Sequence, residues 1–347
     1  MSDLTTRLSR SIESGGPITV AQYMAQANAH YYASRDPLGA AGDFTTAPEI
    51  SQMFGELVGL CLANLWVRAG APPDTTYLEL GPGRGTLAAD ALRAMRSAGL
   101  RPPVHCVETS PTLRKAQAER VPDARWHEEV GSILANGPVL AVANEFFDAL
   151  PVRQLVRTER GWHERLVGWH EGRFMPLPGP PVGTGPIPPQ LRAAPPGTVI
   201  ETSPAALAVL RQLAQMIASS GGAALIIDYG HNRTSAGETL QAVSRHAFAD
   251  PWSRPGERDL TAHVDFAALG EAARAEGVRV VGPVGQGAWL RALGIDERAA
   301  SLVKAAPARA SEIESARHRL TAPDQMGELF RVLAVVAPSW PDPAGFA

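Results

Sequence analysis

The residues from Glu79 to Gly85, ELGPGRG, combine one carboxylate with three glycines at alternate positions. A short apolar run, TTYLEL, leads into them, and a helix-like stretch, TLAADALRAM, follows. Glycines let a ligand approach the backbone closely, and free N–H groups at the start of a helix bind its oxygen atoms. We therefore predict a nucleotide-type site that contains Glu79, Gly81, Pro82, Gly83 and Gly85.

The position of the acid indicates which ligand this loop would bind. A dinucleotide fingerprint needs a third glycine where Thr86 stands, and a P-loop needs a Gly-Lys-Ser/Thr ending that is absent. A carboxylate at position 79 would repel a diphosphate and attract an ammonium group. S-adenosylmethionine has an ammonium group, a carboxylate, a ribose diol and a sulfonium, and no phosphate. The spacing resembles the first motif of class I methyltransferases, and it predicts this compound as cofactor.

A second acid, Glu108, ends the apolar run VHCVE some twenty residues after the glycines. An acid in this place can accept hydrogen bonds from both hydroxyls of a ribose. The same feature occurs in proteins that bind NAD, so Glu108 alone does not distinguish the two cofactors.

Polar residues also follow the apolar run PVLAVAN, in the stretch NEFFD. Ligands of open α/β sheets lie at the carboxyl ends of the strands, so Asn144, Glu145 and Asp148 are candidate catalytic residues. If residues 145–149 form a helical turn, Glu145 and Asp148 share a face. A carboxylate could orient an amine or guanidine acceptor and help to remove its proton. Alternatively, Asn144 and Asp148 could cap a helix.

The surrounding pattern indicates which elements position these residues. Apolar runs alternate with helical patterns from residue 75 onward, which predicts a parallel sheet with helices on both faces. Residues 1–71 are predicted to form an N-terminal helical segment, and residues 72–347 the main domain. Two insertions are expected in that domain. One, at about 152–202, contains a hairpin and a Pro-rich loop, and the other, at about 232–325, is largely helical.

Two stretches carry more detailed expectations. In TAPEISQMFGELVGLCLANLW, Thr46 and Glu49 form a T-x-x-E capping box, so a helix is expected to begin at Thr46. Gly55 and Gly59 leave a gap on that helix where another element could pack closely. Residues 176–197, PLPGPPVGTGPIPPQLRAAPPG, are dense in Pro and Gly and are expected to form an extended loop rather than a packed element.

Composition excludes several other classes of protein. The 347 residues are 45% hydrophobic and 19% charged, with a net charge of −3, which predicts a globular protein without a nucleic-acid surface. The two cysteines and nine histidines show no metal-ligand spacing, so no metal is expected. No apolar run is long enough for a membrane span, and the N-terminus lacks an apolar leader. We therefore expect a cytoplasmic enzyme.

Several longer stretches together resemble one known family, the MidA-type methyltransferases, which are relatives of a mitochondrial methyltransferase needed for respiratory complex I assembly. The stretches are DPLGAAGDFTTAPEISQMFGELVGL, ELGPGRGTLAADALRA, VETSPTLRKAQ, NEFFDALPVRQ, GGAALIIDYGH, DLTAHVDF and MGELFRVLAVV. They cover the chain from about residue 16 to residue 337. The chain departs from the family pattern before Tyr31, where a turn is shortened.

The resemblance implies a fold, a cofactor and further site residues. The implied fold is α/β, a Rossmann-like class I methyltransferase sheet that is mostly parallel with seven strands. An N-terminal and inserted helical cap and a β-hairpin insertion accompany it. The implied cofactor is S-adenosylmethionine, held by the glycine loop and Glu108. Gly42, Asp43, Phe44 and Thr45 match a family signature that is expected to close over the cofactor or the acceptor.

Three functions remain open at this point. The first is methylation of a protein, with an arginine of a respiratory complex I subunit as the acceptor that the resemblance implies. The second is methylation of a small molecule, and the third is an assembly factor that binds the cofactor without transferring a methyl group. The apolar N-terminal helices could support a homodimer or could equally belong to the core.

Overall fold

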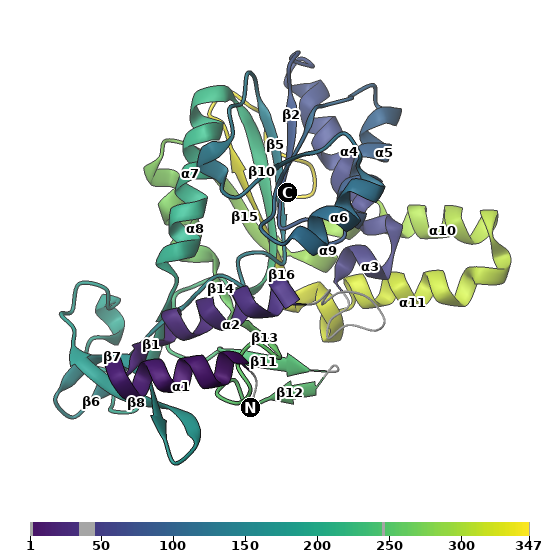
Figure 1. Ribbon diagram of the computed structural model, residues 1–347. Helices are drawn as coiled ribbons and strands as arrows, with labels where there is room; N and C mark the ends of the chain where they lie inside the picture. Colours follow the sequence, from purple (N-terminus) through teal and green to yellow (C-terminus); the bar gives the residue numbers. More distant parts are fainter. Residues whose placement is uncertain (1–2, 35–45, 245–246, 347) are drawn as a thin grey trace. The chain divides into compact units, whose positions relative to one another are not determined.

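The computed structural model describes residues 3–34, 46–244 and 247–346 (Figure 1). These residues form two compact units. The first consists of residues 3–34, Asp148–Ala208 and His231–Ala268, and the second of residues 46–147, Val209–Gly230 and 269–346. The predicted boundary after residue 71, with insertions at about 152–202 and 232–325, stays a prediction.

The second unit contains a mixed β-sheet. Seven of its strands follow one another in the order β15-β16-β10-β5-β2-β3-β4. Strands β10, β5, β2, β3 and β4 are parallel, whereas β16 runs antiparallel to both of its neighbours. An α/β fold with a mixed sheet is therefore confirmed. The strand bounds are β2 Thr76–Leu80, β3 Val104–Val107, β4 Arg125–His127, β5 Val139–Asn144, β10 Gly222–His231, β15 Arg279–Gly285 and β16 Phe330–Val336.

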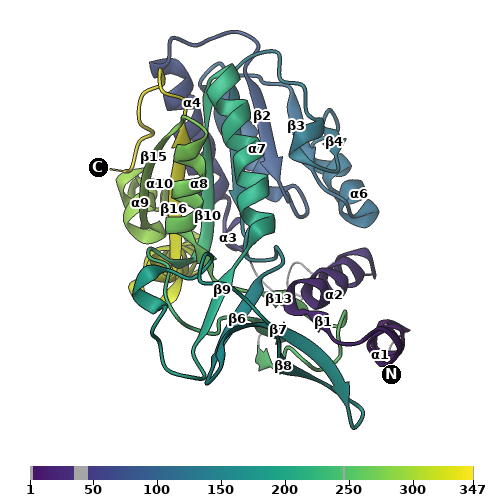
Figure 2. The same ribbon diagram turned by 90° about the vertical axis from the view of Figure 1, so that its left-hand side faces the viewer.

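Helices cover both faces of this sheet, with α4 and α5 on one face and α7 on the other (Figures 1 and 2). Every residue of β2, β3 and β5 is consequently buried, which explains why these strands read as continuous apolar runs. None of the helices in the described parts of the chain is long and apolar enough to cross a membrane. The helix bounds are α3 Ala47–Ile50, α4 Gln52–Arg68, α5 Thr86–Ser97, α6 Pro111–Arg120, α7 Pro204–Ser220, α8 Phe266–Ala275, α9 Gln286–Ala292, α10 Ile295–Ala305 and α11 Ala310–Thr321.

The glycines of α4 allow α5 to pack directly against it. A Cβ atom on Gly55 would lie 2.6 Å from Cβ of Asp90, and one on Gly59 would lie 2.4 Å from the carbonyl oxygen of Ala91. The close approach predicted from these two glycines is confirmed.

The helix expected to begin at Thr46 is instead divided in two. Thr46 makes no side-chain cap, and Ser51 adopts an extended backbone between α3 and α4. The Ser51 hydroxyl then accepts a hydrogen bond from the backbone N–H of Met53 and caps α4. The capping-box prediction was wrong because the carboxylate of Glu49 accepts a hydrogen bond from Thr86 instead of closing its own helix.

The first unit is built from antiparallel sheets and two helices. Its larger sheet has the order β1-β7-β6-β9, with β8 paired to β7, and its smaller sheet has the order β12-β11-β13. One apolar cluster joins α1 and α2 to the sheets through side chains such as Leu8, Tyr23, Val167 and Leu260. The bounds are α1 Asp3–Gly15, β1 Ile18–Thr19, α2 Val20–Ser34, β6 Arg153–Thr158, β7 Gly161–His170, β8 Arg173–Pro181, β9 Val199–Thr202, β11 Gln241–Ser244, β12 Ala247–Ala249, β13 Asp259–Thr261 and β14 Val264–Asp265.

The sequence predicted an extended loop for the Pro-rich segment 176–197, but parts of this segment are paired or packed. Its first part belongs to β8, which pairs along one side with β7. Proline is tolerated in a strand that uses only one side of its backbone for pairing. Further along the segment, Ile187 is 1% exposed and packs in a cluster with Trp162 and Leu155. The prediction was wrong for these residues because edge pairing and apolar burial compensate for the missing N–H donors.

Candidate active site

The predicted cofactor and acceptor residues of the second unit meet at one edge of its sheet. In the register of the strands, Leu80 of β2 pairs with Val107 of β3 and with Ala143 of β5. The next residue along each strand is therefore Gly81, Glu108 or Asn144. The structure thus brings Glu79, the glycine loop, Glu108, Asn144 and Glu145 to the carboxyl ends of three adjacent strands, where open α/β sheets bind ligands.

The glycine loop has a backbone that only glycine adopts easily. Gly81, Gly83 and Gly85 have φ angles of +62°, +55° and +81°. A Cβ atom on Gly81 would also lie 2.8 Å from the Phe146 ring. The buried Pro82 closes the turn, because its carbonyl accepts a hydrogen bond of 2.7 Å from the N–H of Gly85. The loop therefore exposes backbone to a ligand at the start of α5.

Glu79 is a buried carboxylate for which the described part of the chain provides no cation. It is 2% exposed, and its Oε2 accepts a hydrogen bond of 2.5 Å from the Tyr77 hydroxyl. Burial raises the pKa of Glu79 to about 7, and the hydrogen bond from Tyr77 only partly opposes this rise. Among the described residues no basic side chain pairs with Glu79, so a ligand with an ammonium group would supply the missing positive charge.

Glu108 and Gln117 form a second buried pair beside the loop. Glu108 accepts hydrogen bonds from the N–H of Ser110 at 2.7 Å and from Nε2 of Gln117 at 3.3 Å, and burial raises its pKa. The same Nε2 of Gln117 donates to the Gly83 carbonyl at 2.8 Å, and its Oε1 accepts from Trp126 at 2.7 Å. Gln117 was not predicted, since a glutamine within a helix carries no motif.

We expect Gln117→Leu to weaken S-adenosylmethionine binding roughly tenfold and to destabilise the fold by about 2 kcal/mol. The reason is that the change leaves the half-buried Gly83 carbonyl and Trp126 indole without their partner, and such a group costs about 1–3 kcal/mol when fully buried and less here. Calorimetric titration and urea unfolding would measure the two effects. Gln212→Leu, at an exposed glutamine of α7, is the control and should change neither the affinity for S-adenosylmethionine nor the free energy of unfolding. If Gln117→Leu bound the cofactor as tightly as wild type, the role of Gln117 would be contradicted.

Asn144 and Glu145 lie at the end of β5, where the sequence predicts the acceptor. Glu145 has a left-handed backbone with φ +49°, an uncommon conformation for a glutamate. Its Oε1 accepts hydrogen bonds from the N–H of Ala47 and from Nδ2 of Asn144, both at 3.2 Å. The Oδ1 atom of Asn144 is buried, and none of the described residues donates a hydrogen bond to it. A buried acceptor without a donor is uncommon, so Asn144 is a candidate for a contact that a ligand or a water would complete.

The remaining predicted residues belong to the first unit or lie outside the described residues. The sequence predicted that Glu145 and Asp148 share a face if residues 145–149 form a helical turn. These residues form no such turn, because the left-handed backbone of Glu145 does not fit a right-handed helix. Asp148 belongs to the first unit, where its carbonyl accepts a hydrogen bond from Ala262. The signature Gly42, Asp43, Phe44 and Thr45 lies outside the described residues.

Two further acids position the site and were not predicted to do so. Asp228, within β10, is fully buried, and its Oδ2 accepts a hydrogen bond of 3.0 Å from the N–H of Phe147. Glu49 of α3 accepts a bond of 2.5 Å from the Thr86 hydroxyl, at the first residue of α5. The position of Asp228 directly after the apolar run AALII is a usable signal, whereas no local pattern links Glu49 to Thr86.

These features fit S-adenosylmethionine better than a dinucleotide. The glycine cradle provides room and N–H donors, Glu79 provides a negative charge without a cation, and Glu108 provides a buried acceptor for ribose hydroxyls. A pyrophosphate at this loop would face Glu79 and would be repelled. Among the described residues, no group of three or more His, Cys, Asp or Glu side chains could hold a metal ion.

Comparison with known proteins agrees with this geometry. Residues 57–284 match the model of a family described as "Putative S-adenosyl-L-methionine-dependent methyltransferase". Protein arginine methyltransferase NDUFAF7 of Mus musculus is 36% identical over 94% of this chain and 82% of the mouse protein. The NDUFAF7 homolog of Drosophila melanogaster is 37% identical over 96% of this chain and 84% of the fly protein. Both of these relatives are named as mitochondrial.

A solved structure with a similar fold contains S-adenosyl-homocysteine, the product that S-adenosylmethionine leaves after methyl transfer. It is a "likely methyl transferase" from Burkholderia thailandensis in complex with S-adenosyl-homocysteine, with a TM-score of 0.84 and 28% identity over 99% of this chain and 93% of that one. The predicted cofactor, S-adenosylmethionine, and the predicted family are thereby confirmed. This chain belongs to the family of S-adenosyl-L-methionine-dependent methyltransferases to which those proteins belong.

Proposed function

We propose that the protein methylates an arginine side chain of another protein. The observation that carries this proposal is the pair at the end of β5, where the Glu145 carboxylate stands beside a buried Asn144 oxygen that lacks a described donor. A guanidinium has several N–H donors in one plane and matches such a pair of acceptors. The curated relatives named protein arginine methyltransferase support the same acceptor.

The chemistry divides between the two sides of the site. S-adenosylmethionine, when bound, supplies a methyl group on a sulfonium, and its transfer breaks the C–S bond, forms an N–C bond and leaves a thioether. Glu79 and the glycine loop bind the amino-acid part of the cofactor, and Glu108 binds the ribose. An arginine has a pKa above about 12 and stays protonated, so the transfer must also release a proton from nitrogen. Glu145 orients the guanidinium and accepts that proton or passes it to water.

Most of the rate should come from positioning. In-line transfer between two held groups replaces an encounter in solution, and that replacement is worth several kcal/mol. The strained backbone of Glu145 fits this view, because the hydrogen bonds from Ala47 and Asn144 fix the carboxylate in one orientation. Phe146, which lies over Gly81, walls the side of the loop.

The identity of the acceptor is part of the proposal. We take it to be a subunit of respiratory complex I or its equivalent, as the family resemblance of the sequence implies. Methylation of a small molecule is the alternative for the same site. The cytoplasmic location and the homodimer predicted from the sequence stay predictions.

A labelling experiment tests the function. Lysate from cells that lack the gene is incubated with the enzyme and methyl-labelled S-adenosylmethionine, and labelled proteins are hydrolysed to identify the methylated amino acid. We expect one labelled protein that yields methylarginine, and no label with Gly83→Val, which blocks the loop. Label only in small molecules would indicate the alternative acceptor class, and no label above the variant would indicate a binding protein without transferase activity.

A further inference from the structure

Helix α3 connects the acceptor side of the site to the cofactor side. At its first residue, the N–H of Ala47 donates to Oε1 of Glu145 at 3.2 Å. Two residues on, Oε1 of Glu49 accepts a hydrogen bond of 2.5 Å from the Thr86 hydroxyl, next to Gly85 of the loop. Because β2 and β5 are neighbours in the sheet, this four-residue turn spans the ends of both strands. Glu49 therefore lies on the same edge of the sheet as Glu145.

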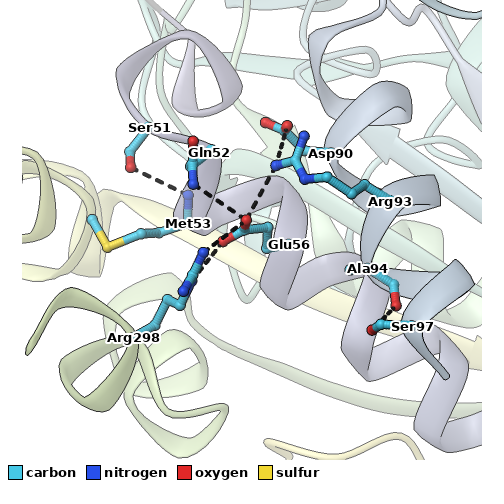
Figure 3. A network of polar contacts seen from close by, with 9 residues as sticks. All are labelled: Ser51, Gln52, Met53, Glu56, Asp90, Arg93, Ala94, Ser97 and Arg298. Carbon is cyan, nitrogen blue, oxygen red and sulfur yellow. Dashed lines mark hydrogen bonds and ion pairs between the residues drawn. The ribbon is translucent and has the colours of Figure 1, made fainter. Parts of the chain in front are cut away.

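The acids around Glu49 already have cations, whereas Glu49 has none among the residues that the structure describes. Arg93 bonds to Glu56 at 3.1 Å and to Asp90 at 2.7 Å. Arg298 bonds to Glu56 through Nε at 2.7 Å and Nη2 at 3.0 Å. Figure 3 shows how these four side chains face one another. Both arginines of this network are thus occupied. Within the described residues, no Lys, Arg or His side chain pairs with the half-buried Glu49.

The charge of Glu49 is felt by its neighbours. Burial raises the pKa of Asp90, Arg93 opposes that rise, and the negative charges of Glu56 and Glu49 add to it. A half-buried carboxylate whose charge is not neutralised by a neighbouring cation attracts a positively charged ligand. The sheet edge thus has two carboxylates, Glu145 and Glu49, and the acceptor of the proposed reaction is a cation.

We infer that Glu49 is a second carboxylate of the acceptor site and that it holds the acceptor guanidinium together with Glu145. The inference rests on the proposed function. One carboxylate can accept two N–H bonds from a guanidinium, which leaves further donors of the same plane for a second carboxylate. Two acids on different elements would fix the plane of the guanidinium, so that one nitrogen faces the methyl donor. A lysine ammonium would gain less from this arrangement, because it is a compact charge without a planar fork.

The test uses the acceptor protein identified by the labelling experiment and measures initial rates against its concentration. In Glu49→Gln the amide oxygen can still accept the Thr86 hydroxyl, so the turn is kept and only the charge is lost. We expect the KM for the acceptor to rise roughly 30-fold or more, as for loss of one partner of a desolvated charge pair, while the Kd for S-adenosylmethionine changes less than about twofold.

Three further variants separate charge from structure. Glu49→Asp retains the charge and should recover part of the lost KM. Thr86→Val removes the hydroxyl that bonds to Glu49 but not the charge, and should affect the acceptor KM much less than Glu49→Gln. Glu312→Gln, at an exposed glutamate of α11, is the control for a neutralised surface acid and should behave as wild type.

The outcomes distinguish this inference from the proposed function. An unchanged KM in Glu49→Gln with an active wild type would overturn the role of Glu49 and leave arginine methylation intact. An equal loss in Thr86→Val, or an equal weakening of cofactor binding, would show that Glu49 acts only by holding the loop and would also overturn it. If the wild type labels no protein arginine, the proposed function fails, and this inference fails with it.

Discussion

Glu79→Gln is expected to weaken S-adenosylmethionine binding by roughly 100-fold or more near neutral pH. Glu79 is 2% exposed and has no basic partner among the described residues, so the cofactor ammonium is the group that would neutralise it. Removing one partner of a buried charge pair costs on the order of 2–5 kcal/mol, because the other charge is left without compensation. Calorimetric titration with S-adenosylmethionine measures the loss directly.

The same substitution should change how stability depends on pH. The folded-state pKa of Glu79 lies above its ordinary value, so the folded protein binds this proton more tightly than the unfolded chain. The contribution of Glu79 to stability is therefore highest below pH 4.5, and it falls as the pH rises to about 7. With a pKa raised from 4.5 to about 7, the decline amounts to about 3 kcal/mol.

Urea unfolding of the cofactor-free protein at several pH values checks this effect. Relative to wild type, Glu79→Gln should gain about 3 kcal/mol between pH 4.5 and 7, since it lacks the titrating group. Glu119→Gln, at an exposed acid of α6, should follow the wild-type curve. A variant with unchanged cofactor affinity and an unchanged pH profile would show that Glu79 is an ordinary strand-end acid.

Glu145→Gln is the second change for which we expect a large effect. The variant retains the hydrogen bond from Ala47 to the side-chain oxygen but loses the charge that orients the guanidinium and receives its proton. We expect kcat for the acceptor protein to fall by roughly 10²–10⁴-fold, the range for a positioned acid or base, while the Kd for S-adenosylmethionine stays within about twofold. Single-turnover assays with a labelled methyl group would measure the rate.

Glu171→Gln is a matched control for this experiment. Glu171 is also a glutamate with a left-handed backbone, at φ +48°, but it is exposed in the turn between β7 and β8. The two variants therefore share the chemical change and the backbone conformation, and only Glu145→Gln should lose activity. Loss of cofactor binding in Glu145→Gln would instead indicate that Glu145 supports the loop rather than the acceptor.

Local sequence patterns predicted the glycine turn and the strands that flank it. Glu79, Gly81, Gly83 and Gly85 were recognisable because a ligand-binding turn needs glycine at left-handed positions, and the structure has φ above +50° at all three glycines. The strand register then places Glu108 beside them, as the alternation of strands and helices predicted. Such features depend on neighbours within the sequence, so a single chain reveals them.

The acceptor side depended on contacts that the sequence does not show. Glu49 bonds to Thr86, 37 residues away, and this contact overrode the local capping box. On the cofactor side, Gln117 likewise joins Gly83 to Glu108 across α6, and its residue type does not mark such a role. The left-handed Glu145, which removed the expected helical turn, is fixed by tertiary hydrogen bonds rather than by propensity.

The central claim is that a buried carboxylate beside bare glycine backbone selects a zwitterionic sulfonium cofactor over a phosphate-bearing one. A calorimetric titration of the wild-type protein with S-adenosylmethionine and with NAD, repeated between about pH 5 and 7, tests it most directly. We predict one S-adenosylmethionine per chain, an affinity that rises up to about tenfold per pH unit as Glu79 ionises, and no heat from NAD. Binding of NAD at this loop, or an affinity for S-adenosylmethionine that does not rise with pH, would contradict the claim.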